Sequence, residues 1–225
     1  MKNKIETMQL TDQHEKTLSR RGRVYWNNYE TQIFYKVYNR DCLLDDSSNV
    51  EARLRQIVQL TDTMEFLPKT TYSCEKDILK MIQKRLIKQK DLREIEYTKR
   101  LSLVDQFAKS LDELYDEGFI HGDINRKNII YSENRLCLVD LEPSLLQIKD
   151  RVKQWMSTKP YVCDEDIRNN NISSKTDFLG FCCFVKWFLL DDKSPQEYSK
   201  DCAEIINNFR TVISPFTNLT RILVI

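Results

Sequence analysis

Glycine, proline and histidine are scarce in this sequence. Its 225 residues include 4 Gly, 5 Pro and 2 His. So little glycine and proline leaves no long linker or low-complexity tract, and two histidines argue against a histidine-based metal site. No apolar run reaches the length of a transmembrane helix, and the first residues lack the apolar core of a signal peptide. These absences predict a folded chain with no membrane span.

Charge and cysteine content also exclude several classes. The formal net charge is +1, so no overall field favours nucleic acid or a membrane surface. The seven cysteines are odd in number, and their spacing fits neither a disulfide framework nor a zinc site. Cys182 and Cys183 lie in an apolar segment and are expected in the core. Free thiols indicate a reducing compartment.

The most informative stretch runs from His121 to Asn128 and reads HGDINRKN. It contains Asp123 and Asn128, and Asp140 follows beyond a turn. Phosphoryl transfer from ATP needs a carboxylate to position the attacking hydroxyl and oxygen ligands to hold Mg²⁺. Asp123 suits the first role, while Asn128 and Asp140 suit the second.

Two short apolar segments separate these polar groups. Residues 129–131 and 136–139 are predicted to be strands, joined by a turn at Glu133 and Asn134. In such a hairpin Asn128 precedes one strand and Asp140 ends the other, so both would lie at the same end. The alternative is a surface hairpin with ordinary acidic flanks, but the combined spacing favours a catalytic site.

The rest of the chain divides into a strand-rich part and a helical part. Strands are predicted at 23–26 and 31–38 with a turn at Asn27 and Asn28, and two more within 70–82. Helical spacing of apolar residues predicts a helix at 50–60 and a long one at 92–118, which Gly118 would end. A further apolar helix is expected after Asp177, and another at 196–211.

At these residues the sequence resembles the protein-kinase superfamily. His121-Gly122-Asp123 with Asn128 resembles the catalytic loop H-R-D-x-x-x-x-N, and Asp140-Leu141-Glu142 resembles D-F-G. Gly122 replaces the loop arginine, and Glu142 replaces the glycine. The HGD and D-x-E patterns are also similar to aminoglycoside and choline kinases, which phosphorylate small molecules. The catalytic loop alone therefore leaves the acceptor open.

The resemblance implies an α+β fold with two lobes. These are a small antiparallel β N-lobe at residues 18–85 and a truncated, mainly helical C-lobe at 86–225, after a flexible N-terminus at 1–17. It also implies that Asp123, Lys36 and Asn128 are catalytic, with ATP and Mg²⁺ as cofactors. Asn128, Asp140 and Glu142 would hold the metal, although Glu142 could equally be a polar turn residue.

On the nucleotide side, the resemblance makes Lys36 the strand lysine that contacts phosphates, and Glu51 the helix acid that pairs with it. The alternatives are a strand lysine facing solvent and a glutamate that favours the helix dipole. The phosphate loop would be residues 19–23, where Gly22 is the one glycine. Arginines of that loop could grip phosphate instead, and Arg126 or Lys127 would supply a cation that the catalytic loop lacks.

Residues 157–165 resemble the end of a protein-kinase activation segment, with Thr158, Tyr161 and Glu165 in register. Asp177 resembles the buried aspartate that anchors the catalytic-loop backbone, although an ordinary helix N-cap at Thr176-Asp177 is compatible with that role. Small-molecule kinases with HGD loops generally lack this segment. The resemblance thus favours a protein serine/threonine acceptor, which Thr158 would help to select.

Only a short tail follows the apolar helix that contains Trp187, and in this reduced size the chain resembles the bacterial effector kinases of the OspG/NleH type. This resemblance implies a monomer with a protein substrate and a host activating protein, no nucleic acid, and a cytoplasmic site of action, after secretion into the host cytosol by a non-classical route. Two alternatives stay open. One is a small-molecule kinase acting on a sugar, lipid headgroup or antibiotic, and the other is a pseudokinase binding module, which the glycine-poor phosphate loop favours.

Overall fold

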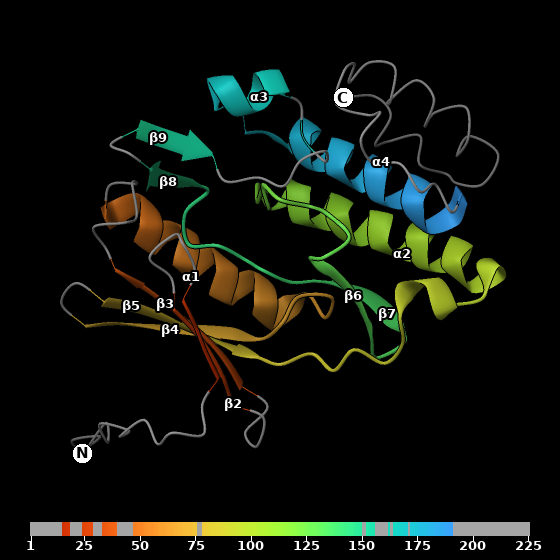
Figure 1. The fold of residues 1–225 in the computed structure, drawn as a ribbon, viewed down its shortest axis with the longest axis horizontal. Coiled ribbons are helices and arrows are strands. Elements are labelled where there is room, and N and C mark those ends of the chain that lie inside the picture. Colours follow the sequence, from red (N-terminus) through yellow and green to blue (C-terminus); the bar gives the residue numbers. More distant parts are fainter. Residues whose placement is uncertain are drawn as a thin grey trace.

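The computed structural model describes residues 15–18, 24–28, 33–39, 47–75, 78–149, 152–155, 162, 164–170 and 172–190. An antiparallel sheet with one helix forms the N-terminal lobe, and two long helices form the base of the C-terminal lobe (Figure 1). A small hairpin follows the first of these two helices in the chain and lies on the side of that helix that faces the sheet (Figure 1). This is the bilobal α+β architecture that the sequence predicts.

The N-lobe sheet has five strands in the order β1-β2-β3-β5-β4, and neighbouring strands are antiparallel. Their bounds are β1 (Glu15–Leu18), β2 (Val24–Asn28), β3 (Ile33–Asn39), β4 (Thr70–Glu75) and β5 (Ile78–Lys84). Asn27 and Asn28, expected in a turn, pair with Phe34 and Ile33 inside the sheet. β1 extends the sheet into the segment expected to be peripheral. The central position of β3 brings Lys36 into the interior of the lobe.

Helix α1 (Ser47–Thr63) packs against the sheet beside β4. Val50, Leu54, Ile57 and Leu60 are buried at spacings of three and four residues, which places them on one helix face. The helix ends before Pro68, and the chain then enters β4. The predicted helix at 50–60 is therefore confirmed and is longer at both ends.

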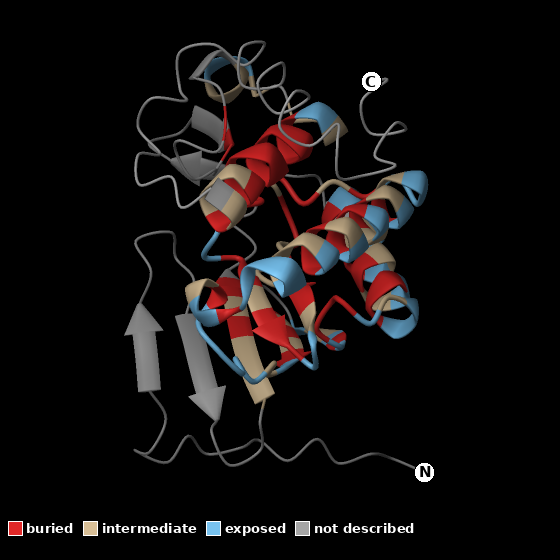
Figure 2. Ribbon diagram, turned by 90° about the vertical axis from the view of Figure 1, so that its right-hand side faces the viewer, coloured by how far each residue is buried: buried red, intermediate tan, exposed pale blue. Residues whose placement is uncertain are grey.

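In the C-lobe, α2 (Tyr97–Asp116) packs along α4 (Ser174–Leu190). The contact is aromatic, since the Phe107 ring centroid lies 6.1 Å from that of Phe181 and 6.3 Å from that of Phe184. Figure 2 shows α4 coloured as buried over most of its length. α2 ends as predicted, because Gly118 adopts a φ of +70° that favours glycine.

The start of the long helix differs from the prediction. A short 3-10 helix, η2 (Leu92–Glu94), comes first, and Asp91 caps it by accepting a hydrogen bond from the Arg93 amide at 3.1 Å. The chain is extended at Ile95 and Glu96 before α2 begins at Tyr97. The cap interrupts a pattern of apolar residues that reads as continuous in the sequence.

The remaining elements lie between α2 and α4 in the chain. They are β6 (Ile129–Ser132), β7 (Arg135–Leu138), β8 (Leu146–Lys149), β9 (Val152–Trp155) and α3 (Asp164–Asn169). β6 and β7 are the predicted hairpin, and its turn residues Glu133 and Asn134 have φ of 50° and 63°. β8, β9 and α3 were not predicted, and the helix predicted at 196–211 lies outside the described residues.

Two predictions from composition can also be compared with the fold. Cys182 and Cys183 are buried, as expected, and Cys137 is buried as well. No helix in the described part of the chain is both long and apolar enough to cross a membrane.

Candidate active site

Asp177 anchors the loop that contains His121, Gly122 and Asp123. It is 1% exposed, and its two oxygens accept hydrogen bonds from the His121 amide at 2.6 Å and the Gly122 amide at 2.7 Å. Burial raises the pKa of Asp177 to about 7, and these two bonds oppose part of the rise. Gly122 has a φ of +82°, a conformation that glycine adopts without strain. The predicted anchoring role of Asp177 is confirmed.

His121 holds the loop to the strand that leads to Asp140. Its Nε2 lies 2.9 Å from the Val139 carbonyl oxygen, and its Nδ1 lies 3.2 Å from the Asp123 amide nitrogen. A carbonyl only accepts and an amide only donates, so the proton belongs on Nε2 and Nδ1 is the acceptor. Desolvation by burial lowers the pKa of His121 to about 4. His121 is therefore a neutral structural link between Asp123 and Val139, the residue that precedes Asp140.

We expect the His121 ring to stay neutral from pH 8 down to pH 5. Its NMR ring-proton signals should then hold their position over that range, and a His14→Gln variant leaves His121 as the single histidine to observe. A titration midpoint near 6.5, the value of an unperturbed histidine, would contradict this.

The pH dependence of unfolding reports the protonation of His121 less directly, because Asp177 also contributes to it. The lowered pKa of His121 makes stability fall as pH drops from 6.5 towards 4, because the unfolded chain then takes up the proton first. The raised pKa of Asp177 acts in the opposite sense, since stability is lost as pH rises through 7. The ring signals separate the two.

Asp123 and Asn128 are joined by hydrogen bonds. The Asn128 Nδ2 donates to the Asp123 carbonyl oxygen at 2.9 Å and to the Asp123 carboxylate at 3.2 Å. This orientation commits the amide nitrogen of Asn128 and leaves its Oδ1 as the atom suited to a metal. Asn125 braces the same loop, because its side chain donates to the Asp123 carbonyl at 3.0 Å and accepts from the Lys127 amide at 2.8 Å.

The β6–β7 hairpin brings Asn128 and Asp140 to one end, as predicted. Asn128 immediately precedes β6, Asp140 follows β7 by one residue, and the Val139 amide donates to the Asn128 carbonyl at 2.8 Å. Asp140 has a φ of +69°, which is uncommon for a residue other than glycine. Backbone outliers of this kind cluster at functional sites. Here the unusual conformation lies at the metal-ligand candidate.

Lys36 is buried, with 2% of its surface exposed. Its ammonium contacts all three residues of the turn Asp140-Leu141-Glu142, called the D-L-E turn below. It forms an ion pair with Asp140, lies 3.2 Å from the Glu142 Oε1, and donates to the Leu141 carbonyl at 3.3 Å. The Tyr38 hydroxyl donates to the other oxygen of Glu142 at 2.9 Å. A lysine facing solvent is excluded by this burial.

The structure does not bring Glu51 to Lys36, which corrects the predicted helix partner. Glu51 lies on the outer face of α1, with 49% of its side chain exposed, and it forms an ion pair with Arg55 at 3.7 Å. The residue of α1 that contacts the D-L-E turn is Arg53. Its Nε donates to the Glu142 carbonyl at 2.9 Å, and its guanidinium donates to the Ile120 carbonyl at 2.8 Å.

A cleft of about 410 Å³ contains three of the predicted residues, Lys36, Asn128 and Asp140. The other residues that line it come from β3, the loop before β4, β5 and the segment after it, and the β6–β7 hairpin with the residue that follows it: Phe34, Pro68, Gln83, Lys84, Arg85, Leu86, Ile130 and Val139. A lining that combines apolar side chains with polar and charged ones suits a nucleotide base and its phosphates.

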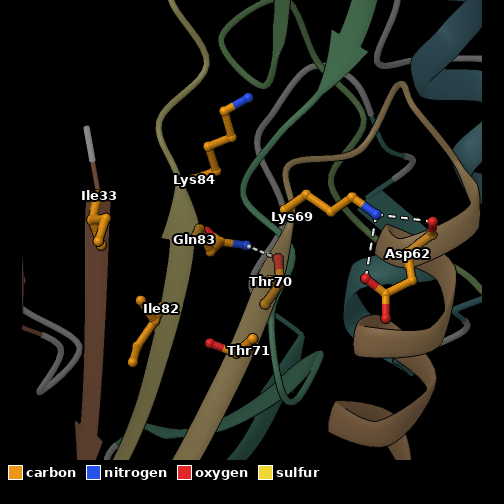
Figure 3. A pocket seen from close by; sticks show the side chains of 8 residues that line it. All are labelled: Ile33, Asp62, Lys69, Thr70, Thr71, Ile82, Gln83 and Lys84. Atoms are coloured by element: carbon orange, nitrogen blue, oxygen red, sulfur yellow. Dashed lines mark hydrogen bonds and ion pairs between the residues drawn. The ribbon is translucent and has the colours of Figure 1, made fainter. Parts of the chain in front are cut away.

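A second hollow, of about 420 Å³, lies beside β4, β5 and the end of α1 (Figure 3). In it the Lys69 ammonium donates to the Asp62 carbonyl at 2.9 Å and lies 3.3 Å from its carboxylate, and Gln83 donates to Thr70. None of the predicted catalytic residues lines this hollow. The cleft at Lys36 is therefore the candidate site.

Other predicted residues lie away from the cleft or outside the described part. Arg126 is exposed, its guanidinium lies 5.7 Å from the Trp187 ring centroid, and it does not line the cleft. Gly22, Thr158 and Tyr161 lie outside the described residues. Glu165 belongs to α3, where only its backbone is described. The roles of these residues stay predictions.

Three residues at the site were missed. Tyr38 and Arg53 contact Glu142, and Trp155 of β9 donates from Nε1 to the Gly122 carbonyl at 2.9 Å. Tyr38 could have been found, because it lies two residues from Lys36 and so on the same side of the strand. Arg53 and Trp155 have no such local signal, since their roles depend on how separate elements pack.

The donor set at the cleft fits Mg²⁺ with a nucleotide. Mg²⁺ is usually held by one or two carboxylates together with phosphate oxygens and waters, and Asn128 and Asp140 supply oxygens of this kind. Among the described residues, no group of three or more His, Cys, Asp and Glu could hold a metal alone. When bound, the metal would neutralise phosphate charge, and Lys36 is a buried cation that lines the same cleft.

Comparison with protein-family models identifies the family of this chain. The protein kinase domain family matches residues 49–220, more than half of the 225 residues. The match begins after β3, so Lys36 precedes it, and the sheet order and contacts described above supply that part of the site. A search of curated proteins finds no match. The matched range spans the catalytic loop, the D-L-E turn and α4, and the chain belongs to the protein kinase domain family.

Proposed function

We propose that this chain is a minimal protein serine/threonine kinase that transfers the γ-phosphoryl group of ATP, with Mg²⁺, to a protein hydroxyl. The observation that carries the proposal is the arrangement around one loop and one turn. Asp123 is hydrogen-bonded to Asn128, and Lys36 is paired with Asp140. This combination provides the groups that phosphoryl transfer requires.

Each of these residues has one task. Asp123 orients the acceptor hydroxyl and accepts its proton. Asn128 and Asp140 provide oxygen ligands for Mg²⁺. Lys36 places a buried positive charge in the cleft for the phosphates, where low exposure to water strengthens its electrostatic effect. His121 and Asp177 hold the loop that presents Asp123.

A protein acceptor is supported by the segment between the D-L-E turn and α4. It folds into β8 and β9, and Trp155 bonds directly to the catalytic loop at Gly122. This contact brings the end of β9 next to the residue that precedes Asp123, where a peptide would need a support. The sequence of the same segment contains Thr158, Tyr161 and Glu165 in the register of protein kinases.

A small-molecule acceptor is the second candidate. It is favoured by Gly122 and by Glu142, which stand where protein kinases have arginine and glycine. The hairpin β8–β9 argues for the first candidate, because a small acceptor does not need a peptide support.

We also propose that the chain is a bacterial effector that acts in the host cytosol, together with a host activating protein. The support is the likeness to kinases of the OspG/NleH type, and the free thiols at Cys74, Cys137, Cys182 and Cys183 fit a reducing compartment.

The acceptor can be identified with labelled ATP and Mg²⁺. The purified chain is incubated with a generic basic protein, with host-cell lysate, and separately with an aminoglycoside, choline and a sugar. We expect label on protein, phosphoserine or phosphothreonine after hydrolysis, and loss of the label in an Asp123→Ala variant.

The outcomes distinguish the candidates. Label on small compounds alone would replace the first candidate by the second. Phosphotyrosine would contradict the serine/threonine assignment. Failure to bind ATP with or without Mg²⁺, in a chain that unfolds cooperatively, would indicate a binding module without catalysis.

A further inference from the structure

Glu142 is the residue of the D-L-E turn whose chemistry the kinase reaction does not explain. It stands where the family pattern has a glycine, and a glutamate there adds a charge next to the metal-ligand candidate. Its side chain is 13% exposed, and Asp140, in the same turn, is 34% exposed. A buried carboxylate needs partners that compensate for its lost hydration.

Both carboxylate oxygens of Glu142 have such partners. Oε1 lies 3.2 Å from the Lys36 ammonium, and Oε2 accepts from the Tyr38 hydroxyl at 2.9 Å. Lys36 and Tyr38 lie two residues apart in β3, so their side chains project from the same side of that strand. The strand therefore presents a cation and a hydroxyl together to one carboxylate.

The position of Glu142 relative to the cleft distinguishes two possible roles, a metal ligand and an ionic partner of Lys36. Lys36, Asn128 and Asp140 line the cleft, whereas Glu142 does not. A metal ligand for the nucleotide would have to face this cleft, as Asp140 does. Glu142 instead contacts Lys36 and Tyr38 away from the lining of the cleft, which suits an ionic partner of the lysine.

Helix α1 reaches the same turn by a different residue. Arg53 donates to the backbone carbonyl of Glu142 at 2.9 Å and to that of Ile120 at 2.8 Å, and its guanidinium lies 4.3 Å from the Phe119 ring centroid. Gln56, one turn later, donates to the Glu117 carbonyl at 2.9 Å. The helix is thus tied to the turn and to the approach to the catalytic loop, and it contributes no acid to Lys36 through Glu51.

We propose that Glu142, oriented by Tyr38, is the positioning residue that holds Lys36 for the nucleotide phosphates, in the place of a glutamate from helix α1. With two carboxylates on one ammonium, Asp140 is available to a metal while Lys36 keeps an ionic partner. The lysine is then positioned within β3 and the D-L-E turn. An outward movement of α1 would not remove its partner.

Two isosteric variants test this directly. Glu142→Gln keeps the size and removes the charge, and Glu51→Gln makes the same change on the outer face of α1. We expect Glu142→Gln to weaken ATP binding roughly 10- to 100-fold, the range typical for loss of a charged hydrogen-bond partner, and Glu51→Gln to change it less than about twofold. Binding is measured by calorimetry in EDTA and again with Mg²⁺.

The measurement in EDTA distinguishes a role of Glu142 in positioning Lys36 from a role in binding the metal. A positioning role predicts that the loss appears in EDTA and that the Mg²⁺ concentration for half-maximal ATP binding is unchanged. Tyr38→Phe, which keeps the ring and removes one hydroxyl, should weaken ATP binding in the same direction by roughly two- to fivefold. It provides a second reading if Glu142→Gln folds poorly in thermal unfolding.

The inference rests on the proposed nucleotide-dependent function, and binding measurements separate the two failures. A native chain that binds no ATP overturns both. ATP binding that is unaffected by Glu142→Gln, or weakened as much by Glu51→Gln, overturns the inference alone. A shift confined to the Mg²⁺ dependence would make Glu142 a metal ligand and overturn it as well.

Discussion

Asp140→Asn should reduce phosphoryl transfer at least about a thousandfold while the chain stays folded. A metal that polarises phosphate oxygens supplies several kcal/mol to the transition state, and each 1.36 kcal/mol is a factor of ten in rate. Asparagine keeps the size of the side chain and tolerates the positive φ of 69° found at this residue. Alanine would add backbone strain and confuse the result. The rate is measured at saturating ATP over a range of Mg²⁺ concentrations.

Asp105→Asn is the matched control for this charge change. Asp105 lies on α2, and its carboxylate is paired with Lys109 at 2.8 Å on the exposed side of the helix. Loss of such a surface pair costs at most about 1 kcal/mol, so activity should not change. If Asp140→Asn kept more than a tenth of the native rate, Asp140 would not be the principal metal ligand.

The parts of the site that could be predicted from sequence are those fixed by short spacing. Asp123 and Asn128 lie in one loop, and the strands between Asn128 and Asp140 form a hairpin with a two-residue turn. The short turn fixes the register of the two strands, and the register determines that Asn128 and Asp140 lie at the same end of the hairpin. Lys36 was identified through the resemblance to kinases, with a strand lysine facing solvent as the alternative, and its burial excludes that alternative.

The error at Glu51 has a physical cause. Apolar spacing identifies which face of α1 packs on the sheet, but the rotation of that helix relative to the D-L-E turn depends on tertiary packing. Val50 and Leu54 face the core, and Arg53 is the residue that reaches the turn. Glu51 and Arg55 then fall on the outer face, four residues apart.

β8 and β9 were missed for a different reason. Each has four residues, the shortest length over which alternation can be recognised, and the sequence VKQW of β9 does not alternate. Their position is held in part by contacts distant in sequence, because Trp155 bonds to Gly122 through its side chain and to Asn170 through its amide. No local pattern contains that information.

Gly180→Ala should destabilise the protein and impair catalysis together. A methyl group on the Gly180 Cα would overlap the Ile124 carbonyl oxygen and lie 3.2 Å from its carbonyl carbon, and backbone atoms cannot rotate away as a side chain can. Alanine favours a helix by about 1 kcal/mol over glycine, but overpacking of about 1–3 kcal/mol or more opposes it. We expect a net loss of about 2 kcal/mol in the free energy of unfolding, measured in urea.

The loss of activity follows from the position of Ile124, which directly succeeds Asp123. Moving α4 away from Ile124 would also disturb Asp177, which lies one turn earlier on α4 and accepts the His121 and Gly122 amides. Gly118→Ala separates steric from conformational effects, because Gly118 has a φ of +70° and nothing within 4 Å of an added methyl. That variant should lose about 1 kcal/mol of stability and keep its rate. A Gly180→Ala protein with native stability and rate would show that α4 is not held this closely against the catalytic loop.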